Sequence, residues 1–444
     1  MSHFTRRIIF WSFFLLFIVL TFYFSLVVSG YSINWTFLKD PCKIGFLQKT
    51  GILALNSNPN GAKIELDRNF KSLFAPKDIL KDKKIKTPYK IKNLIPGEYS
   101  LKIELDGYWP FEKTVYIDPG QTTYLEDVVL LKKTLPVMLF SSPVQEVKIN
   151  NFSSHLIFID DNKFFDINNE VEVGLEKNVD SLDFLSDNFL LINDKEVFNY
   201  KEKKYLDFKV EDKSNIRNIK DDKNNLYYLD SDSLFSYNFI FQENNLILND
   251  TGLVDYYFSG DYIFLISQHD NFEQFKIYSN KDKKIIRFID LPLNGDYRFI
   301  PSENNLIFVY DQLYSSLYLI DPFSQLNPIR DVLRNIKDIN FVDNNSFLYF
   351  SNFEIRIFNL SLMQSSLVSR FEKEIKSLLW HPRGYVIFSD GKNIKAIDFK
   401  YDKYITNLFT FDTVSGLKLD KNGGSLFFTG KIGNREGLYK LFIQ

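Results

Sequence analysis

The chain has 444 residues, of which 45% are hydrophobic, a composition that predicts folded domains and excludes a long disordered protein. Its 54 lysines and arginines nearly balance its 56 aspartates and glutamates, so no global field would attract nucleic acid, and we expect no such partner. A single cysteine, Cys42, excludes an internal disulfide and a cysteine-based metal site, while 45 Phe and 25 Tyr favour strands, so we predict a mostly β protein.

The first predicted element is an apolar run of 22 residues without charge, from 8 to 29. A helix of that length rises about 33 Å, which is enough to cross the hydrocarbon core of a bilayer. Arg6 and Arg7 precede the run, so the positive-inside rule places residues 1–7 in the cytoplasm and the rest of the chain outside. We therefore predict a single-pass signal anchor in the cell membrane, although VVSG (27–30) leaves open that the segment is cleaved.

A juxtamembrane linker (30–50) leads into a module (51–133) whose apolar residues alternate with polar ones. The alternating runs are separated by turn sequences that contain NPNG, IPGE and DPGQ. Burial with a period of two, together with turns that tolerate unusual backbone angles, predicts a small antiparallel β-sandwich.

The turn residues of this module carry a resemblance to a known family. They are Pro59, Gly61 and Ala62 in NPNGAKIELD, Thr87 and Pro88 in KTPYKI, Pro96 and Gly97 in LIPGEYSLKI, and Gly107 and Tyr108 in DGYWPF. In this pattern the module resembles the PEGA domain, which implies an extracytoplasmic accessory or binding role and no catalysis. Glycine permits turns that a Cβ would block and proline rigidifies corners, so we predict that these residues hold backbone shape. The insertion at 68–86 departs from the family, and it is either a partner-binding loop or a surface excursion.

From residue 134 to residue 444 the chain repeats every 35 to 43 residues. Each unit opens with two apolar residues three apart and continues with two or three more apolar runs. Four short strands per repeat are typical of a β-propeller blade, because each small sheet buries its faces only against its neighbours. We predict eight blades, and seven remain open because the stretch from 240 to 300 is irregular. The openings are VQEV at 144, VDSL at 179, IRNI at 216, VDYY at 254, YRFI at 297, IKDI at 336, IKSL at 375 and VSGL at 414.

The two ends of this repeat array complement each other. The last unit ends at Gln444 after its third strand, and LPVMLF (135–140) is an apolar strand that stands before the first unit. We predict that this strand completes the last sheet and closes the ring. The units resemble TolB-like or WD40-like propeller repeats in pattern, most clearly at 378–398 and 417–441.

The sequence offers no clear catalytic or metal site. Its histidines are His3, His155, His269 and His381, and no two of them have the spacing of metal ligands. Acidic clusters at 159–163, 220–225 and 419–424 lack the complete pattern of a calcium loop and are interpreted as turns. We therefore predict no catalytic residue, no cofactor and no metal ion.

Two functions follow from this organisation. The favoured one is a non-enzymatic scaffold of the cell envelope, of bacterial type, whose anchored propeller presents a surface to an envelope protein or polysaccharide. The alternative is a propeller hydrolase or lyase that acts on an envelope glycan through carboxylates lining its channel. Fold alone does not choose between them, because propellers host many functions.

Overall fold

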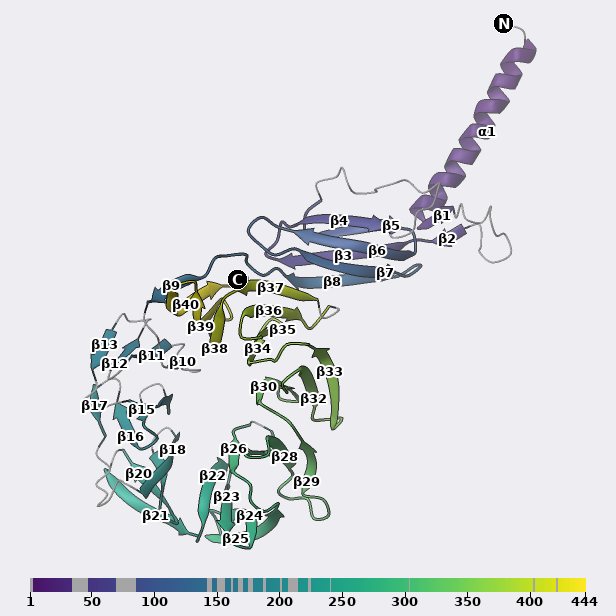
Figure 1. Cartoon of the computed structure of the whole chain (residues 1–444). Helices are drawn as coiled ribbons and strands as arrows, with labels where there is room; N and C mark the ends of the chain where they lie inside the picture. The colour runs from purple at the N-terminus through teal and green to yellow at the C-terminus, as the bar shows by residue number, and fades with distance from the viewer. Residues whose placement is uncertain are drawn as a thin grey trace. The chain divides into compact units, whose positions relative to one another are not determined.

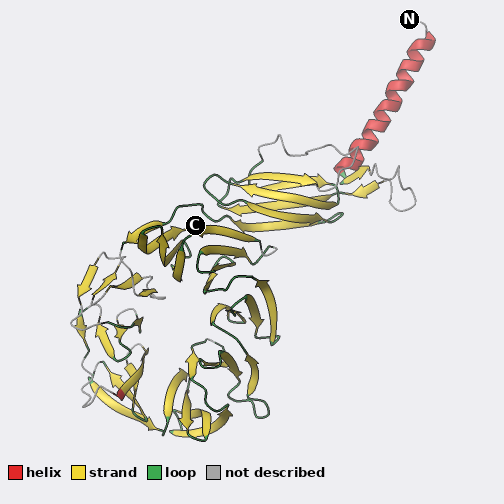
Figure 2. Ribbon diagram, viewed as in Figure 1, coloured by secondary structure: helices red, strands yellow, loops and turns green. Residues whose placement is uncertain are grey.

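The computed structural model describes most of the chain as strands, with one long helix (Figure 2). This confirms the predicted mostly β class. Contacts divide the chain into two compact units, Met1–Thr134 with Ile443–Gln444, and Leu135–Phe442. Cys42, His155 and most of the insertion at 68–86 lie outside the described residues. The described residues are 3–33, 47–68, 85–141, 146–149, 156–160, 163–166, 171–174, 179–186, 189–199, 202–206, 215–222, 225–239, 241–302, 304–401, 404–420 and 422–444.

The helix α1 (His3–Val28) contains a segment long and apolar enough to cross a membrane. It begins before the predicted position 8, so Arg6 and Arg7 lie in its first turns. Its apolar window is not buried by any residue that the structure describes, so burial in a protein core does not explain its composition. A signal sequence has the same properties, and cleavage therefore stays an open alternative. After the helix, β1 (Tyr31–Ile33) pairs with β2 (Leu47–Lys49).

Six strands form the small module of the first unit, in two three-stranded sheets of order β5-β3-β8 and β4-β6-β7. The predicted alternation is clear in β6, where Leu101 and Ile103 are buried and the intervening Lys102 is not. The prediction of a purely antiparallel sandwich was wrong for one pair, because β3 and β8 run parallel. These are the first and last strands of the module, so no hairpin sets their relative direction. The strands are β3 (Gly51–Asn58), β4 (Lys63–Arg68), β5 (Tyr89–Leu94), β6 (Gly97–Glu104), β7 (Phe111–Ile117) and β8 (Thr122–Val129).

The second unit is a propeller of four-stranded sheets. Eight such sheets follow one another along its described residues, and the number of blades in the ring stays a prediction. The stretch from 240 to 300, irregular in sequence, holds a complete sheet, β22–β25. The strands are β10 (Glu146–Ile149), β11 (Leu156–Asp160), β12 (Lys163–Asp166), β13 (Val171–Gly174), β14 (Leu182–Phe184), β15 (Phe189–Ile192), β16 (Glu196–Asn199), β17 (Lys204–Tyr205), β18 (Ile216–Asp222), β19 (Asn225–Asp230), β20 (Ser233–Asn238), β21 (Glu243–Asn249), β22 (Leu253–Ser259), β23 (Tyr262–His269), β24 (Phe272–Ser279), β25 (Lys284–Leu291), β26 (Tyr297–Ile300), β27 (Ile307–Asp311), β28 (Ser316–Ile320), β29 (Ile329–Leu333), β30 (Asp338–Asp343), β31 (Ser346–Phe350), β32 (Glu354–Asn359), β33 (Gln364–Arg370), β34 (Ser377–His381), β35 (Tyr385–Ser389), β36 (Asn393–Asp398), β37 (Ile405–Thr410), β38 (Thr413–Leu419), β39 (Ser425–Ile432) and β40 (Arg435–Phe442), with β9 (Val137–Phe140) joining the last sheet.

Hydrophobic side chains pack between successive sheets rather than within a single central core. Phe275 of β24 shares a cluster with Tyr297 of the next sheet, and Phe347 of β31 shares one with Phe308 of the sheet before it. Each of these four rings is at most 2% exposed, and burying a large apolar side chain stabilises a fold by about 1.5–3 kcal/mol. Every sheet therefore depends on its two neighbours, as expected for a propeller (Figure 1).

Polar side chains also join the first strands of successive sheets. Arg217 of β18 donates a hydrogen bond to the carbonyl oxygen of Leu253 in β22 (2.7 Å). Lys220 of β18 pairs with the Asp255 carboxylate of β22 (2.7 Å), whose other oxygen accepts the backbone N–H of Phe299 in β26 (2.8 Å). Burial lowers the pKa of Lys220 despite the attraction of Asp255. Because a first strand has a sheet partner on only one side, these side chains satisfy backbone groups that the sheet leaves unpaired.

The ring closes as the sequence predicted. The last sheet has the order β38-β39-β40-β9, so residues 137–140 supply its fourth strand. In the antiparallel register Leu438 lies opposite Phe140, and Lys440 lies opposite Val137. In addition, β10 contacts β38, which brings the first and last sheets together. Pairing a strand from before the first sheet with the last sheet removes an exposed edge at the joint.

Gly437 provides a test of this closure, because a Cβ at this position would lie 1.9 Å from the carbonyl oxygen of Phe140. We expect Gly437→Ala to displace β9 and to lower the free energy of unfolding by about 1–3 kcal/mol, a cost typical of overpacking. Urea denaturation of the full chain in detergent measures this change. The control is Gly424→Ala in the turn that leads into β39 of this sheet, where the nearest neighbour of the added Cβ is Asp420 Oδ2 at an ordinary 3.5 Å. Equal stability of the two variants would contradict closure through β9.

Candidate functional site

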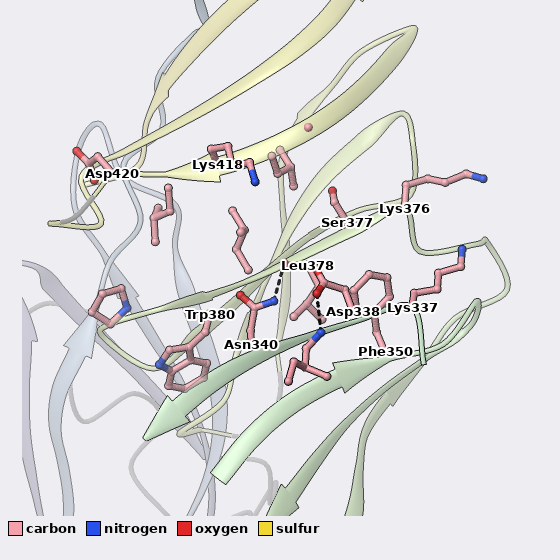
Figure 3. A pocket seen from close by; sticks show the side chains of 16 residues that line it. Lys337, Asp338, Asn340, Phe350, Lys376, Ser377, Leu378, Trp380, Lys418 and Asp420 are labelled. Atoms are coloured by element: carbon pink, nitrogen blue, oxygen red, sulfur yellow. Dashed lines mark hydrogen bonds between the residues drawn. The ribbon is translucent and has the colours of Figure 1, made fainter. Parts of the chain in front are cut away.

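A hollow in the propeller is lined by residues in and beside the first strands of three consecutive sheets, β30, β34 and β38 (Figure 3). Its volume is about 760 Å³. We call this hollow the channel pocket. It is lined by Lys337, Asp338, Ile339, Asn340, Phe350, Lys376, Ser377, Leu378, Leu379, Trp380, Pro382, Gly416, Leu417, Lys418, Leu419 and Asp420.

Alternation along the first strands places polar groups in this pocket. In β34 Leu378 is buried in the core between sheets, and Trp380, two residues further on the same side of the strand, packs against this core but is only partly buried. The Trp380 ring meets Phe399 edge-on (5.8 Å between ring centroids). In β38 Leu417 is buried, and the following Lys418 extends into the open space above β34 (Figure 3). The apolar residues that define each repeat thus anchor the strands, and the residues between them form the pocket wall.

One wall of the pocket carries a lysine pair that shares a carboxylate. The Glu374 side chain accepts hydrogen bonds from Lys337 and Lys376, both at 2.6 Å. These two bonds lower the pKa of Glu374 to about 2. Lys337 also donates to the carbonyl oxygen of Ile375 (3.2 Å), so its ammonium group bridges two sheets. All three charged side chains are about a third exposed or more, so solvent screens the pairs and their contribution to stability is small.

Asp338 begins β30 in the lining of the pocket, and the residue as a whole is exposed. Loss of solvent around its carboxyl group raises the pKa, and the backbone N–H of Ile339 and the positive charge of Lys418 offset only part of that rise. Beside it, Asn340 donates from its amide to the carbonyl oxygen of Leu378 (3.2 Å), which holds β30 against β34 (Figure 3). Asp338 therefore takes up a proton more readily than an aspartate in water.

Two buried oxygens in the lining have no hydrogen-bond partner among the described protein atoms, namely Ser377 Oγ and Asp420 Oδ1. Buried polar atoms are normally paired, so the wall keeps unused capacity for hydrogen bonds. The lining also contains three lysines, two aspartates and one tryptophan, so it offers charged groups and an aromatic surface.

Two of the four histidines have side chains that the structure describes, and neither faces a metal-binding arrangement. His381 is fully buried at the end of β34, where its Nε2 contacts the carbonyl oxygen of Gly423 (2.8 Å) and its Nδ1 accepts the N–H of Arg383 (3.2 Å). Burial lowers its pKa, which favours the neutral ring. His269 packs against Phe272. Among the residues that the structure describes, no group of three His, Cys, Asp or Glu side chains is placed to hold a metal ion.

The predicted turn residues of the small module partly converge. Thr87 is their centre: its N–H donates to the carbonyl oxygen of Ala62 (2.8 Å), and its carbonyl oxygen accepts the N–H of Gly61 (2.8 Å). The Thr87 hydroxyl also accepts the N–H of Ala62 (3.1 Å) and lies 2.5 Å from Ser57 Oγ, which donates to the carbonyl oxygen of Pro59 (2.7 Å). This network joins β3 to the turns before β4 and β5.

The other predicted turn residues lie apart from this network. Pro88 follows Thr87 directly, and Pro96 precedes β6, which Gly97 begins with a φ of +139°. Gly107 adopts a φ of +81°, and its carbonyl oxygen accepts the N–H of Lys133 (2.8 Å), while Tyr108 forms a bridge to Lys132. Their role in holding backbone shape stays a prediction.

Sequence reasoning missed the lysines and the aspartate of the channel pocket. A signal for them exists, because Lys337 and Lys376 occupy the second position of the openings IKDI and IKSL. Polar residues between two apolar anchors of a first strand point away from the core between sheets. Lys418, in the following LKLD, has no equivalent signal, because its influence on Asp338 depends on how the sheets that carry them are placed in the fold.

Comparison with protein families confirms the resemblance of the module. Residues 50–131 match the PEGA domain. No curated protein matches the chain. The match covers most of the first unit after its helix. The chain therefore combines a candidate membrane helix, a PEGA domain and a propeller.

Solved structures similar to the chain include propellers of several origins. The Dos1 propeller is 12% identical, with 71% of this chain and 96% of that chain covered and a TM-score of 0.47. BamB from Moraxella catarrhalis is 7% identical, with coverages of 70% and 100% and a TM-score of 0.44. The WD40 domain of Neurospora crassa Pan2 is 12% identical, with coverages of 67% and 89% and a TM-score of 0.39. Likenesses at this level carry no information on function.

The Asp338–Lys418 arrangement predicts a titration that NMR of the Asp338 carboxyl carbon can follow. We expect its pKa to lie above the ordinary 3.8, because the carboxylate is poorly solvated in the pocket. Lys418→Met should raise this pKa further by removing a positive charge. Lys376→Met is the control, because Lys376 pairs with Glu374, and it should leave the titration unchanged. An ordinary or lowered pKa in the wild type would contradict the geometry of this pocket.

The same shift has a consequence for stability. A folded-state pKa above the unfolded one contributes stability below pH 3.8 that is lost as the pH rises through the folded value. Asp338→Asn should therefore be more stable than the wild type at neutral pH, and this advantage should disappear in acid.

Proposed function

We propose that this protein is a membrane-anchored binding scaffold of the cell envelope, whose propeller holds a partner at the channel pocket. The observation that carries the proposal is the pocket lining, which combines lysines and aspartates with a partly exposed tryptophan. Such a wall suits recognition, because charge sets orientation and an aromatic ring supplies contact area. A PEGA domain and a propeller both fit a binding role.

The proposed topology has the short N-terminal tail in the cytoplasm and both β units outside. Arg6 and Arg7 lie at the start of α1, and positive charge beside a membrane helix favours the cytoplasmic side. The PEGA domain is of an extracellular type, which supports the same orientation. Anchoring a propeller in this way raises the effective concentration of its binding surface near the envelope.

A glycan hydrolase or lyase remains the second candidate because of Asp338. A general acid needs a raised pKa, and Asp338 has one. A glycosidase needs a second carboxylate, for which the lining offers Asp420. Asp420 follows β38 and its backbone N–H bonds to the carbonyl oxygen of Ser425, so it belongs to a turn. A binding role therefore explains more of the residues that line the pocket than a catalytic role does.

The topology predicts how proteases act on intact cells. Protease added to spheroplasts should digest the propeller, because both β units lie outside the membrane. Immunoblotting with antibodies against the C-terminal residues measures this loss, and a cytoplasmic protein in the same sample is the control. Protection of the propeller in intact spheroplasts, with digestion only after lysis, would contradict the proposed orientation.

The binding role predicts the behaviour of pocket variants in the full chain kept in detergent. We expect the wild type to co-sediment with an isolated envelope fraction and to release no product. Trp380→Ala combined with Lys418→Ala should weaken binding by tenfold or more, since loss of about 1.4 kcal/mol has this effect. Lys431→Ala is the matched control, because this lysine lies on the last sheet outside the pocket lining.

Asp338→Asn separates the two candidate functions. It should leave binding in place, because the amide keeps the shape of the side chain. Release of product by the wild type, abolished by this one change, would replace the scaffold with the hydrolase.

A further inference from the structure

A second hollow lies in the PEGA domain, on the sheet β5-β3-β8. Its volume is about 410 Å³, within the range of small ligand pockets. All three strands contribute to it, and its position in the first unit separates it from the channel pocket.

The hollow is on the outer face of the sheet. A Cβ on Gly51 of β3 would lie 2.3 Å from Ile117 of the opposite sheet, so this side of β3 faces the inside of the sandwich. Leu53 and Leu55 follow with the same period and are buried. Ala54 and Asn56 alternate with them and therefore point outward. Because the side chain of Ala54 is small, it leaves a depression at the centre of this outer face. Ala54 and Asn56 both line the hollow.

The two neighbouring strands place larger side chains on both sides of Ala54. The register places Lys90 of β5 on one side of Ala54 and Tyr124 of β8 on the other. Tyr124 is 59% exposed, and Tyr89, which also lines the hollow, is 45% exposed. Tyr89 belongs to the lining of the hollow, and Tyr124 stands next to the lining residue Ala54 in the neighbouring strand, so two solvent-exposed rings lie at or beside the hollow.

A bulge in β8 adds acceptors to this wall. The register between β3 and β8 shifts after Leu55, and Asp127 adopts a φ of +62°. Bulges redirect side chains, and this one brings Glu126 and Asp127 to the hollow. On its floor, Asn56 Oδ1 is buried without a hydrogen-bond partner among the described protein atoms, a state that costs free energy unless a donor is supplied.

The outer face of the other sheet is built differently. There Lys63 pairs with Glu65 (2.5 Å), and Lys102 lies 3.9 Å from Glu112. These ion pairs are those of an ordinary solvated surface. In the described part of the chain no ion pair involves Lys90 or Asp127, so their charged groups remain available to a ligand.

We propose that this hollow binds a sugar unit of an envelope glycan. Exposed tyrosine rings pack against the C–H faces of a pyranose, while carboxylate and amide oxygens accept its hydroxyl protons and Lys90 donates to its oxygens. A set that mixes donors, acceptors and aromatic surface in one shallow hollow suits a hydroxyl-rich ligand better than an apolar one. This inference goes beyond the proposed function, because it gives the PEGA domain a binding site of its own.

The test uses the full chain in detergent and insoluble glycans as probes, namely peptidoglycan sacculi, chitin and cellulose. We expect co-sedimentation with at least one of them, and the choice among the three distinguishes an N-acetylated glycan from a neutral glucan. Tyr124→Ala should weaken this binding by about tenfold, as loss of an aromatic contact and its buried area implies. The double variant Lys90→Ala with Asp127→Asn should also weaken binding, because it removes both charges of the hollow. Asparagine is chosen at position 127 because it tolerates the left-handed backbone there.

The matched control is Tyr116→Ala, because Tyr116 lies on β7 of the opposite sheet and is 56% exposed, nearly as much as Tyr124. It should bind as the wild type does, and thermal unfolding should show that both variants remain folded. Binding lost in the Tyr124 variant and kept in the Tyr116 variant would assign glycan binding to this face of the PEGA domain, whatever partner the propeller holds. Equal binding by the Tyr124 and Tyr116 variants, or no sedimentation of the wild type with any glycan, would overturn the proposal.

Discussion

The propeller depends on one constraint, which is that a small four-stranded sheet buries its faces only against another sheet. Rings such as Phe275 and Phe347 are buried because a neighbouring sheet covers them. The array must therefore end where it begins, and β9 satisfies this requirement by pairing with β40. Because β9 pairs with β40, the first and last sheets are held together, and their faces can be buried against each other as in the rest of the ring.

The channel pocket is a by-product of the same arrangement. A first strand pairs on one side only, so its other edge presents backbone groups and its polar side chains reach toward the next sheet. In some places these side chains only join sheets, as Lys220 does with Asp255. At β30, β34 and β38 they leave a hollow in which Asp338, Lys418 and Trp380 are gathered. The hollow thus lies where the side chains that join successive first strands leave space between the sheets.

The PEGA domain follows a different principle, because two sheets bury a shared interior and leave two outer faces. One outer face carries ion pairs such as Lys63 with Glu65. The other carries Ala54 at its centre and exposed tyrosines at its borders. A single small residue on a central strand, flanked by a bulge, is sufficient to make this face concave.

The sequence alone determined the apolar N-terminal segment, the PEGA turns, the four-strand repeat and the closing strand at 135–140, because each is a local pattern with a physical period. It also placed Thr87 among the turn residues, but only the tertiary structure decided that its hydroxyl binds the Ala62 N–H. The parallel pairing of β3 with β8 and the placement of Asp338 and Lys418 in the lining of one pocket were likewise decided in three dimensions. These contacts join residues far apart in the chain, and no local period encodes which strands become neighbours or how their registers align.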